Sequence, residues 1–173
     1  MYFKTERLEV KPLTEADEAA VIELLTDDAV KQTYMVPDFS SREEAAGLFR
    51  GLKQLSLTEG RYVGGICLGA SLIGILNETE VSGSRIELGY AFLPNYHNHG
   101  YAAEALSGAI RFLFDHGFEE VAAGAFEENL ASIRVMVKSG MTKLEQHDEI
   151  QYRGKNHNCV YYSARKEPFT AKK

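Results

Sequence analysis

The sequence predicts one α+β domain built on a mixed sheet, with the element order β-α-α-β-β-β-α-β-α-β-β. Two observations predict this class: strand-like runs cluster in the middle of the chain, and helical and strand-like segments alternate after it. The chain has 173 residues, 45% of them hydrophobic and 25% charged, which is enough apolar material for one core. We expect a single domain over residues 1–168 and a C-terminal tail over residues 169–173.

The first third of the chain predicts a strand and two helices. Apolar residues alternate in RLEVKPL, which is strand spacing. Each helix follows a capping signal, Thr14 with Asp17 and Ser41 with Glu44, because an acidic side chain three residues after a Ser or Thr helps to satisfy the free N–H groups of a first turn. The expected ranges are 7–13 for the strand, and 14–25 and 41–59 for the helices.

The rest of the chain predicts further strands and two more helices. Short turns separate three apolar runs, which indicates an antiparallel meander. Apolar residues at helical spacing then predict a helix, and Gly140 stands where a C-cap glycine ends another. The expected strands are 62–68, 72–77, 85–93, 121–126, 142–152 and 158–165, and the expected helices are 100–117 and 129–139.

Charge and cysteine content weigh against several function classes. With 19 Lys and Arg against 25 Asp and Glu, the net charge of −6 is unlike that of a general nucleic-acid binder and is compatible with a cationic substrate such as an amine. Cys67 and Cys159 belong to no CxxC pair, so we expect small buried side chains rather than a zinc or redox site. Neither a membrane span nor a signal peptide is indicated, so we expect a cytoplasmic protein.

The segment LPNYHNHGYAAE, residues 93–104, carries the clearest chemical signal. It joins an apolar strand to an apolar helix. The first turn of a helix exposes N–H groups and partial positive charge, which favour an anion such as a pyrophosphate. Gly100, Ala102 and Ala103 would let phosphate oxygens approach the backbone, and Asn98 belongs to a residue type that tolerates a positive φ.

Two histidines, His97 and His99, lie in the same loop and add hydrogen-bond donors. Two such side chains without a third ligand do not indicate a metal, so we predict no metal site. A loop with one glycine before a helix is also common without any ligand. The pattern alone therefore leaves both phosphate binding and an ordinary helix start open.

Three segments, in matching order and spacing, resemble the GNAT (Gcn5-related N-acetyltransferase) superfamily, and within it the Rim-type group that includes ribosomal-protein N-terminal acetyltransferases. The first is TERLEVKPLTEADEAAVIELLTDD, which resembles TERLxLRPLxxxDxxxxxxLxxD. The others are IELGYAFLPNYHNHGYAAEAL, which resembles EIGYxxxPxYWGKGYATEAL, and ENLASIRVMVKSGM, which resembles NxxSxxVLEKxGF. The resemblance covers nearly the full length and implies the acyl-CoA N-acyltransferase fold, a central twisted, mixed and mostly antiparallel sheet flanked by helices.

The resemblance also implies acetyl-CoA as cosubstrate. In the family, the loop before the helix holds the coenzyme A pyrophosphate by backbone N–H groups, and the preceding strand splays from its neighbour to admit the pantetheine arm. A backbone N–H of Phe92 or Leu93 would then face the thioester carbonyl. The implied cofactor-binding residues are Phe92, Leu93, His97, Asn98, His99, Gly100, Tyr101, Ala102, Ala103, Asn129 and Ser132.

The loop departs from the family pattern Q/R-x-x-G-x-G/A. Gly100 and Ala102 match it, whereas His97 occupies the Q/R position, Asn98 replaces a common glycine and His99 replaces a common basic or amide residue. We therefore expect a weaker affinity for coenzyme A than the usual pattern gives.

Three residues are candidates for catalysis. Ser132 is the candidate proton donor to the leaving thiolate, since Met136 stands where some relatives carry a donating Tyr. Asn129, three residues before Ser132 on one helix face, is equally suited to cap the helix. Glu87 is the candidate base for an attacking ammonium, with a surface carboxylate as the alternative and Glu149 as a weaker candidate.

The resemblance predicts an N-acetyltransferase that transfers an acetyl group to a primary amine by direct attack in a ternary complex. A catalytically impaired coenzyme A-binding module of the same fold is the alternative. A nucleotide-binding domain is disfavoured, because neither GxxxxGK[ST] nor GxGxxG is present.

The partner is expected to be a small-molecule amine or a protein N-terminal amine, not a nucleic acid or a membrane, and a homodimer is left open. Residues 28–39 and 146–158 are expected to line the acceptor groove, with Tyr34, Phe39 and Tyr152 as the aromatic candidates.

Overall fold

The computed structural model of the chain describes residues 1–166, so the predicted domain end at residue 168 and the tail at 169–173 lie outside the described residues. The strands are β1 (Phe3–Lys4), β2 (Leu8–Lys11), β3 (Val63–Leu68), β4 (Ser71–Ser82), β5 (Arg85–Phe92), β6 (Glu120–Phe126), β7 (Thr142–Tyr152) and β8 (Lys155–Arg165). The helices are α1 (Glu18–Thr26), α2 (Asp28–Lys31), α3 (Arg42–Leu57), α4 (Tyr101–Asp115) and α5 (Leu130–Lys138), with single 3-10 turns η1 (Glu15–Asp17) and η2 (Pro94–Tyr96).

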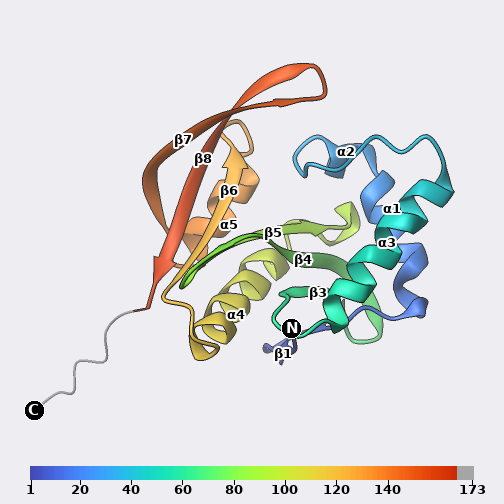
Figure 1. The fold of residues 1–173 in the computed structure, drawn as a ribbon, viewed down its shortest axis with the longest axis horizontal. Coiled ribbons are helices and arrows are strands. Elements are labelled where there is room, and N and C mark those ends of the chain that lie inside the picture. The colour runs from blue at the N-terminus through green and yellow to red at the C-terminus, as the bar shows by residue number, and fades with distance from the viewer. Residues whose placement is uncertain (167–173) are drawn as a thin grey trace, which may run out of the picture.

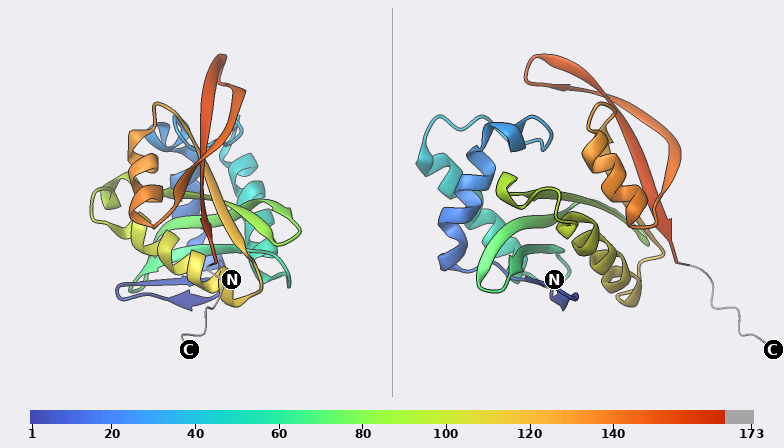
Figure 2. Two further views of the ribbon diagram at one scale, coloured as in Figure 1. Left: turned by 90° about the vertical axis from the view of Figure 1, so that its left-hand side faces the viewer. Right: turned by 180° about the vertical axis from the view of Figure 1, so that it is seen from behind.

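The strands form one sheet in the order β1-β2-β3-β4-β5-β6-β8-β7. Every neighbouring pair is antiparallel except β5 and β6, which α4 connects as a crossover. Helices α1, α2 and α3 gather on one side of the molecule and α4 and α5 on the other (Figures 1 and 2). The predicted α+β class and mixed, mostly antiparallel sheet are confirmed.

The predicted element order is confirmed apart from two short elements, β1 and α2, that the sequence does not predict. They have two and four residues, which is too short for a periodic pattern. Strand β4 also runs past its predicted end, to Ser82, because its polar second half still pairs with β5.

The predicted helix boundaries have the expected chemical causes. The Asp17 carboxylate accepts from both the backbone N–H and the hydroxyl of Thr14, at 2.7 and 2.8 Å. The Ser41 hydroxyl accepts from the Glu44 N–H at 3.2 Å, and Gly140 follows α5 with a φ of +83°.

A separate hydrophobic cluster covers each face of the sheet. The cluster under α4 includes Ile66, Leu76, Ile86, Leu106 and Leu113, and the cluster under α1 and α3 includes Leu13, Leu24, Leu25, Phe49 and Ile75. These large side chains are almost fully removed from water, which makes their burial the main favourable contribution to folding. Both cysteines are buried and free, as predicted.

Strands β5 and β6 pair only at their beginnings. Their register joins Arg85, Ile86 and Glu87 to Glu120, Val121 and Ala122, and goes no further. Beyond this point β5 stays paired with β4 and β6 stays paired with β8. The two halves of the sheet therefore diverge, and the splay that the family resemblance implies is present.

Candidate functional site

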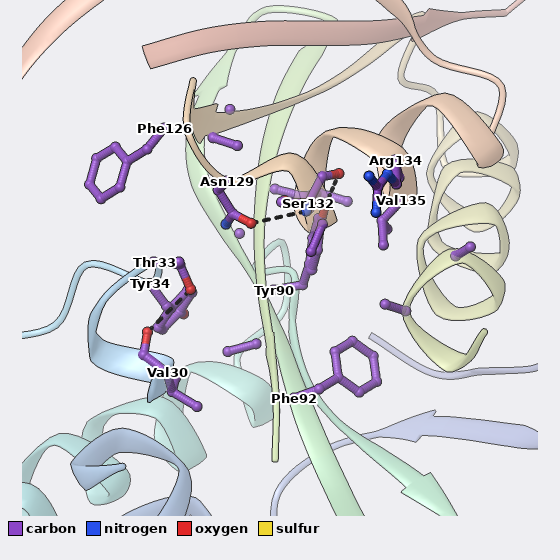
Figure 3. A pocket seen from close by; sticks show the side chains of 18 of the residues that line it. Val30, Thr33, Tyr34, Tyr90, Phe92, Phe126, Asn129, Ser132, Arg134 and Val135 are labelled. Carbon is purple, nitrogen blue, oxygen red and sulfur yellow. Dashed lines mark hydrogen bonds between the residues drawn. The ribbon is translucent and has the colours of Figure 1, made fainter. Parts of the chain in front are cut away.

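A cavity of about 630 Å³ opens over the splay between β5 and β6. Strand alternation sends Glu87 and Gly89 to the face of β5 that carries α1–α3, and Leu88 and Tyr90 to the face that carries α4 and α5. Residues from both faces line this one cavity. Figure 3 shows Tyr90 and Ser132 pointing toward each other, with Thr33 and Tyr34 across the cavity. Groups on opposite faces of the sheet can therefore act on the same ligand.

The loop before α4 presents unpaired backbone donors to this cavity. Asn98 and Gly100 both have left-handed backbones, with φ values of +63° and +82°. The first helical bond runs from the Glu104 N–H to the Gly100 carbonyl. Within residues 1–166, the N–H groups of residues 98–103 donate to no protein acceptor. All of these residues except His99 line the cavity, so the predicted anion cradle is present as geometry.

The two loop histidines hold the loop itself together. His97 Nε2 lies 2.9 Å from the Phe92 carbonyl, and His99 Nδ1 lies 2.7 Å from the His97 carbonyl. Because a carbonyl only accepts, each of these ring nitrogens must carry the hydrogen. The His99 ring also stacks on Tyr101, and His99 does not line the cavity. Their observed contacts are therefore structural.

An ion pair that the sequence analysis did not identify braces the loop from outside. Arg7 Nε lies 2.7 Å from Glu104 Oε2, and its guanidinium covers the Tyr101 ring and donates to the His99 carbonyl. Burial alone would raise the pKa of Glu104, but hydrogen bonds from Thr5 and from Arg7 lower it. Contacts across nearly a hundred residues leave no local signal in the sequence.

Two cations on α5 face the cavity without partners. Arg134 and Lys138 are one turn apart, both line the cavity, and among the described residues neither has an ion-pair or hydrogen-bond partner. Ser139 donates to the Ala103 carbonyl at 3.2 Å, which places this end of α5 against the first turn of α4. Arg134 and Lys138 are four residues apart on the helix that carries Ser132, and this spacing could have identified them from the sequence.

Strand β5 offers one of the two predicted backbone donors. The Leu93 N–H donates to the Ile73 carbonyl at 2.9 Å, and Leu93 is buried outside the cavity lining. The Leu93 N–H is therefore not free to face a ligand, because it donates to β4, and of the two alternatives the Phe92 N–H stays the predicted donor. Hydrogen-bond directions alternate along an antiparallel strand, so the Phe92 N–H points the other way, into the splay.

A hydroxyl pair lies at the centre of the cavity. The Tyr90 and Ser132 oxygens are 2.7 Å apart, and the Asn129 side chain accepts from the Ser132 N–H at 3.1 Å. Burial raises the pKa of Tyr90 to about 12, opposed by its hydrogen bond with Ser132. Asn129 thus caps α5 and also lines the cavity. Sequence reasoning missed Tyr90, although its place on β5 near the splay could have indicated it.

Two other positions do not join the cavity. Met136 is fully buried in the core, so α5 turns this position away from the ligand. Glu149 is exposed, pairs with Asn156 and does not line the cavity, which removes the weaker base candidate.

Glu87 is half-buried in the cavity wall on the α1–α3 side. Thr79 donates to its Oε1 at 3.1 Å, and an Arg85 nitrogen lies 3.4 Å from its Oε2. On the same side, the Tyr34 hydroxyl donates to Asn77 Oδ1 at 2.5 Å. Burial strongly raises the pKa of Tyr34, so this phenol stays protonated.

The predicted acceptor segments reach the cavity only in part. The lining residues from them are Val30, Thr33, Tyr34, Met35 and Ile150. Phe39 packs against the core under α1 and α3 instead. The Tyr152 hydroxyl donates to the Lys31 carbonyl at 2.8 Å and does not line the cavity. Of the three aromatic candidates, only Tyr34 lies in the wall.

The described part of the chain contains no cluster of three or more His, Cys, Asp or Glu side chains placed to hold a metal ion. Within residues 1–166, no helix is long and apolar enough to cross a membrane.

The chain is similar to known acetyltransferases in sequence and in structure. The curated protein YnaD of Bacillus subtilis (strain 168), described as an uncharacterized N-acetyltransferase, is 30% identical over 145 residues, which cover 83% of this chain and 84% of YnaD. A crystal structure of a GNAT-family acetyltransferase from Bacillus anthracis superimposes with a TM-score of 0.82 at 26% identity, over 95% of this chain and 98% of that one.

A structure of RimL, a ribosomal alpha-N-protein acetyltransferase in complex with coenzyme A, superimposes with a TM-score of 0.84 at 17% identity, over 95% of this chain and 98% of RimL. At this identity the likeness shows a common fold. The sequence profile of the acetyltransferase (GNAT) domain matches residues 7–142, which is most of the chain. With the splayed sheet and the free amides before α4, this match shows that the chain belongs to the GNAT acetyltransferase family.

Proposed function

We propose that this chain is an N-acetyltransferase that transfers the acetyl group of acetyl-CoA to a primary amine by direct attack in a ternary complex. One observation carries the proposal: a single cavity runs from the free amides of residues 98–103, through the splay, to Glu87. A thioester along β5 and an amine beside Glu87 would meet in it, which supplies the orientation that a bimolecular transfer needs.

The residues present fit an acyl-coenzyme A. The cosubstrate would supply an activated thioester carbonyl. Unpaired N–H groups before α4 and the free cations Arg134 and Lys138 suit its phosphates. The Phe92 N–H, which points into the splay, can stabilise negative charge that develops on the carbonyl oxygen.

The two faces of β5 carry the groups that accept and donate the protons of the reaction. An aliphatic ammonium has a pKa of about 10.4, so it must lose a proton before its nitrogen attacks the carbonyl carbon. Glu87 takes that proton, directly or through water. As the carbon–sulfur bond breaks, Ser132 donates its proton to the sulfur and Tyr90 replaces it along their 2.7 Å hydrogen bond. The raised pKa keeps Tyr90 protonated at neutral pH.

Release of free thiol from acetyl-CoA across a panel of amines tests this function. The Glu87→Gln variant should lose roughly 10²- to 10⁴-fold in kcat/KM, the contribution of a general base. Glu80→Gln is the matched control, since Glu80 also lies beside Arg85 but is exposed and outside the cavity lining. Coenzyme A binding by calorimetry without thiol release for any amine would favour the impaired binding module instead.

A further inference from the structure

The acceptor half of the cavity, on the Glu87 side of β5, differs in character from the cosubstrate half. Its wall is formed by Val30, Thr33, Tyr34, Met35, Asn77, Thr79, Glu87, Gly89, Ile150, Cys159 and Tyr161. Of these described residues only Glu87 carries a full charge at neutral pH. The cations of the cavity, Arg134 and Lys138, belong to α5 beside the phosphate end.

Apart from the Tyr161 hydroxyl, the polar side chains of this half are already hydrogen-bonded within the protein. The Tyr34 hydroxyl donates to the Asn77 amide oxygen, and the Asn77 amide nitrogen donates to the Glu78 carbonyl. The Thr79 hydroxyl donates to Glu87, and Arg85, outside the cavity lining, forms an ion pair with the same carboxylate. The wall therefore offers a ligand one carboxylate and, beyond it, mainly aromatic faces and aliphatic or sulfur-bearing side chains, those of Val30, Met35, Ile150, Cys159 and Tyr161.

Hydrogen bonds and an ion pair between two distant segments, the β7–β8 hairpin and the chain after α2, fix the position of this wall. The Tyr152 hydroxyl, near the tip of the β7–β8 hairpin, donates to the Lys31 carbonyl at 2.8 Å and accepts from the Val36 N–H at 3.4 Å. Arg153 forms an ion pair with Asp38. In Figure 1 the hairpin tip reaches over toward α2. The segment carrying Tyr34 and Met35 is thus tied to the hairpin, which fixes the position of the two side chains that it adds to the wall.

From this wall we infer the acceptor class: a compact primary monoamine with an apolar body about the size of an aromatic ring. The inference rests on the proposed function and narrows it. One ammonium pairs with Glu87, while a carboxylate or a second ammonium would be removed from water against lining side chains that carry no further charge, which is unfavourable. The nearest other charges, Arg85 beside Glu87 and Asp148 beside Tyr161, lie outside the cavity lining. A protein N-terminus is disfavoured as well, because the hydrogen-bonded side chains of the wall leave few partners for the backbone amides of its following residues.

Matched acceptors test the class by the kcat/KM of thiol release from acetyl-CoA. Phenethylamine should exceed phenylalanine, which adds only a carboxylate, by at least about tenfold, and hexylamine should exceed 1,6-diaminohexane by a similar factor, as unpaired charges cost about a factor of ten or more. A tetrapeptide with a free N-terminus should be turned over more slowly than phenethylamine.

A substitution that adds a charge to the wall tests the inference through a gain of activity, which a loss of folding could not produce. Met35 is 51% exposed at the cavity edge, so its substitution should be tolerated. Met35→Glu adds a second carboxylate and should raise the diaminohexane-to-hexylamine ratio of kcat/KM by about tenfold, whereas the neutral control Met35→Gln should leave that ratio unchanged.

The outcomes distinguish the inference from the function beneath it. Comparable turnover of phenethylamine, phenylalanine and the tetrapeptide would overturn the acceptor class and leave the acetyltransferase standing. Acetyl-CoA binding with no thiol release for any amine would overturn the proposed function. Calorimetry of the same amines against the coenzyme A-loaded protein would then decide the class, with tightest binding expected for the apolar monoamines and equal or absent binding contradicting it.

Discussion

At the scale of single residues, the chemistry of the cavity depends on which backbone N–H and hydroxyl groups already have partners in the protein and which face the ligand. At the end of β5, two neighbouring N–H groups point in opposite directions. The Leu93 N–H donates to β4, and the Phe92 N–H points into the splay. Gly100 adopts a φ of +82°, which an L side chain rarely adopts, and so lets the loop turn its amides toward the cavity. The chemistry is thus set by backbone direction as much as by side-chain identity.

Tyr90 gives a pH-dependent prediction at this scale. Its pKa is raised to about 12 in the folded protein, against about 10 in an unfolded chain. The folded state holds this proton more tightly, so the resulting stability is fully present below about pH 10 and is lost as the pH rises toward about 12. In Tyr90→Phe, the alkaline fall in the free energy of unfolding should be shallower by up to about 1.4 kcal/mol per pH unit, the effect of one proton.

Urea unfolding at a series of alkaline pH values measures this slope. Tyr34 and Tyr161 keep part of the dependence in the variant, because burial raises their pKa values as well. Tyr2→Phe is the control, as Tyr2 is 54% exposed at the far end of the sheet. Identical slopes for Tyr90→Phe and the unmodified protein would contradict the buried, protonated phenol.

At the scale of secondary-structure elements, α5 serves the cavity at both of its ends. Its N-terminus, capped by Asn129, brings Ser132 to Tyr90, and its last turns carry Arg134 and Lys138 toward α4. The same helix buries Met136 in the core, so one amphipathic element supplies both packing and chemistry.

The two cations of α5 should contribute to coenzyme A affinity. Arg134→Gln and Lys138→Gln should each weaken binding by roughly threefold to tenfold, since a hydrogen bond to a charged group is worth about 1 kcal/mol or more. Each should also flatten the dependence of Kd on salt concentration, because exposed charges are screened. Calorimetry at two salt concentrations measures both effects. Arg111→Gln, an exposed change on α4 outside the cavity lining, should alter neither, and equal losses for all three variants would point to a general charge effect.

At the scale of the whole molecule, the cavity joins two halves of a divided sheet. Between β5 and β6 only three residue pairs remain in register, yet both strands and the helices beside them line the same cavity. A ligand there contacts both halves of the folded protein and has no counterpart in the unfolded chain. Binding should therefore stabilise the fold as a whole.

Coenzyme A should accordingly raise the unfolding temperature in a concentration-dependent way. At a hundred times its Kd the ligand should add about 2.7 kcal/mol to the free energy of unfolding. Thermal melts over a coenzyme A titration, with adenosine as a ligand that lacks the pyrophosphate and the pantetheine arm, measure the shift. A melting temperature that ignores coenzyme A would place its binding site elsewhere or nowhere.

Local patterns in the chain predict most of the fold. Alternation and helical spacing place the long strands and helices, and the pairs Thr14–Asp17 and Ser41–Glu44 mark where helices begin, because caps act over three or four residues. The glycine and small residues at 97–103 make an anion site one of two interpretations of that loop, and the family resemblance favours it over an ordinary helix start. β1 and α2 are not predicted because two and four residues are too few for an apolar pattern to repeat.

The sequence by itself determined the element order, the family resemblance and the residues of the loop before α4, since each depends on neighbours along the chain. Only the tertiary structure decided that the Leu93 N–H donates to β4 and that Tyr90 contacts Ser132. It likewise decided that Arg7 braces the loop before α4 and that Tyr152 ties the hairpin to the acceptor wall. These facts depend on strand register and on contacts between distant segments, which packing of the whole chain fixes and local spacing does not.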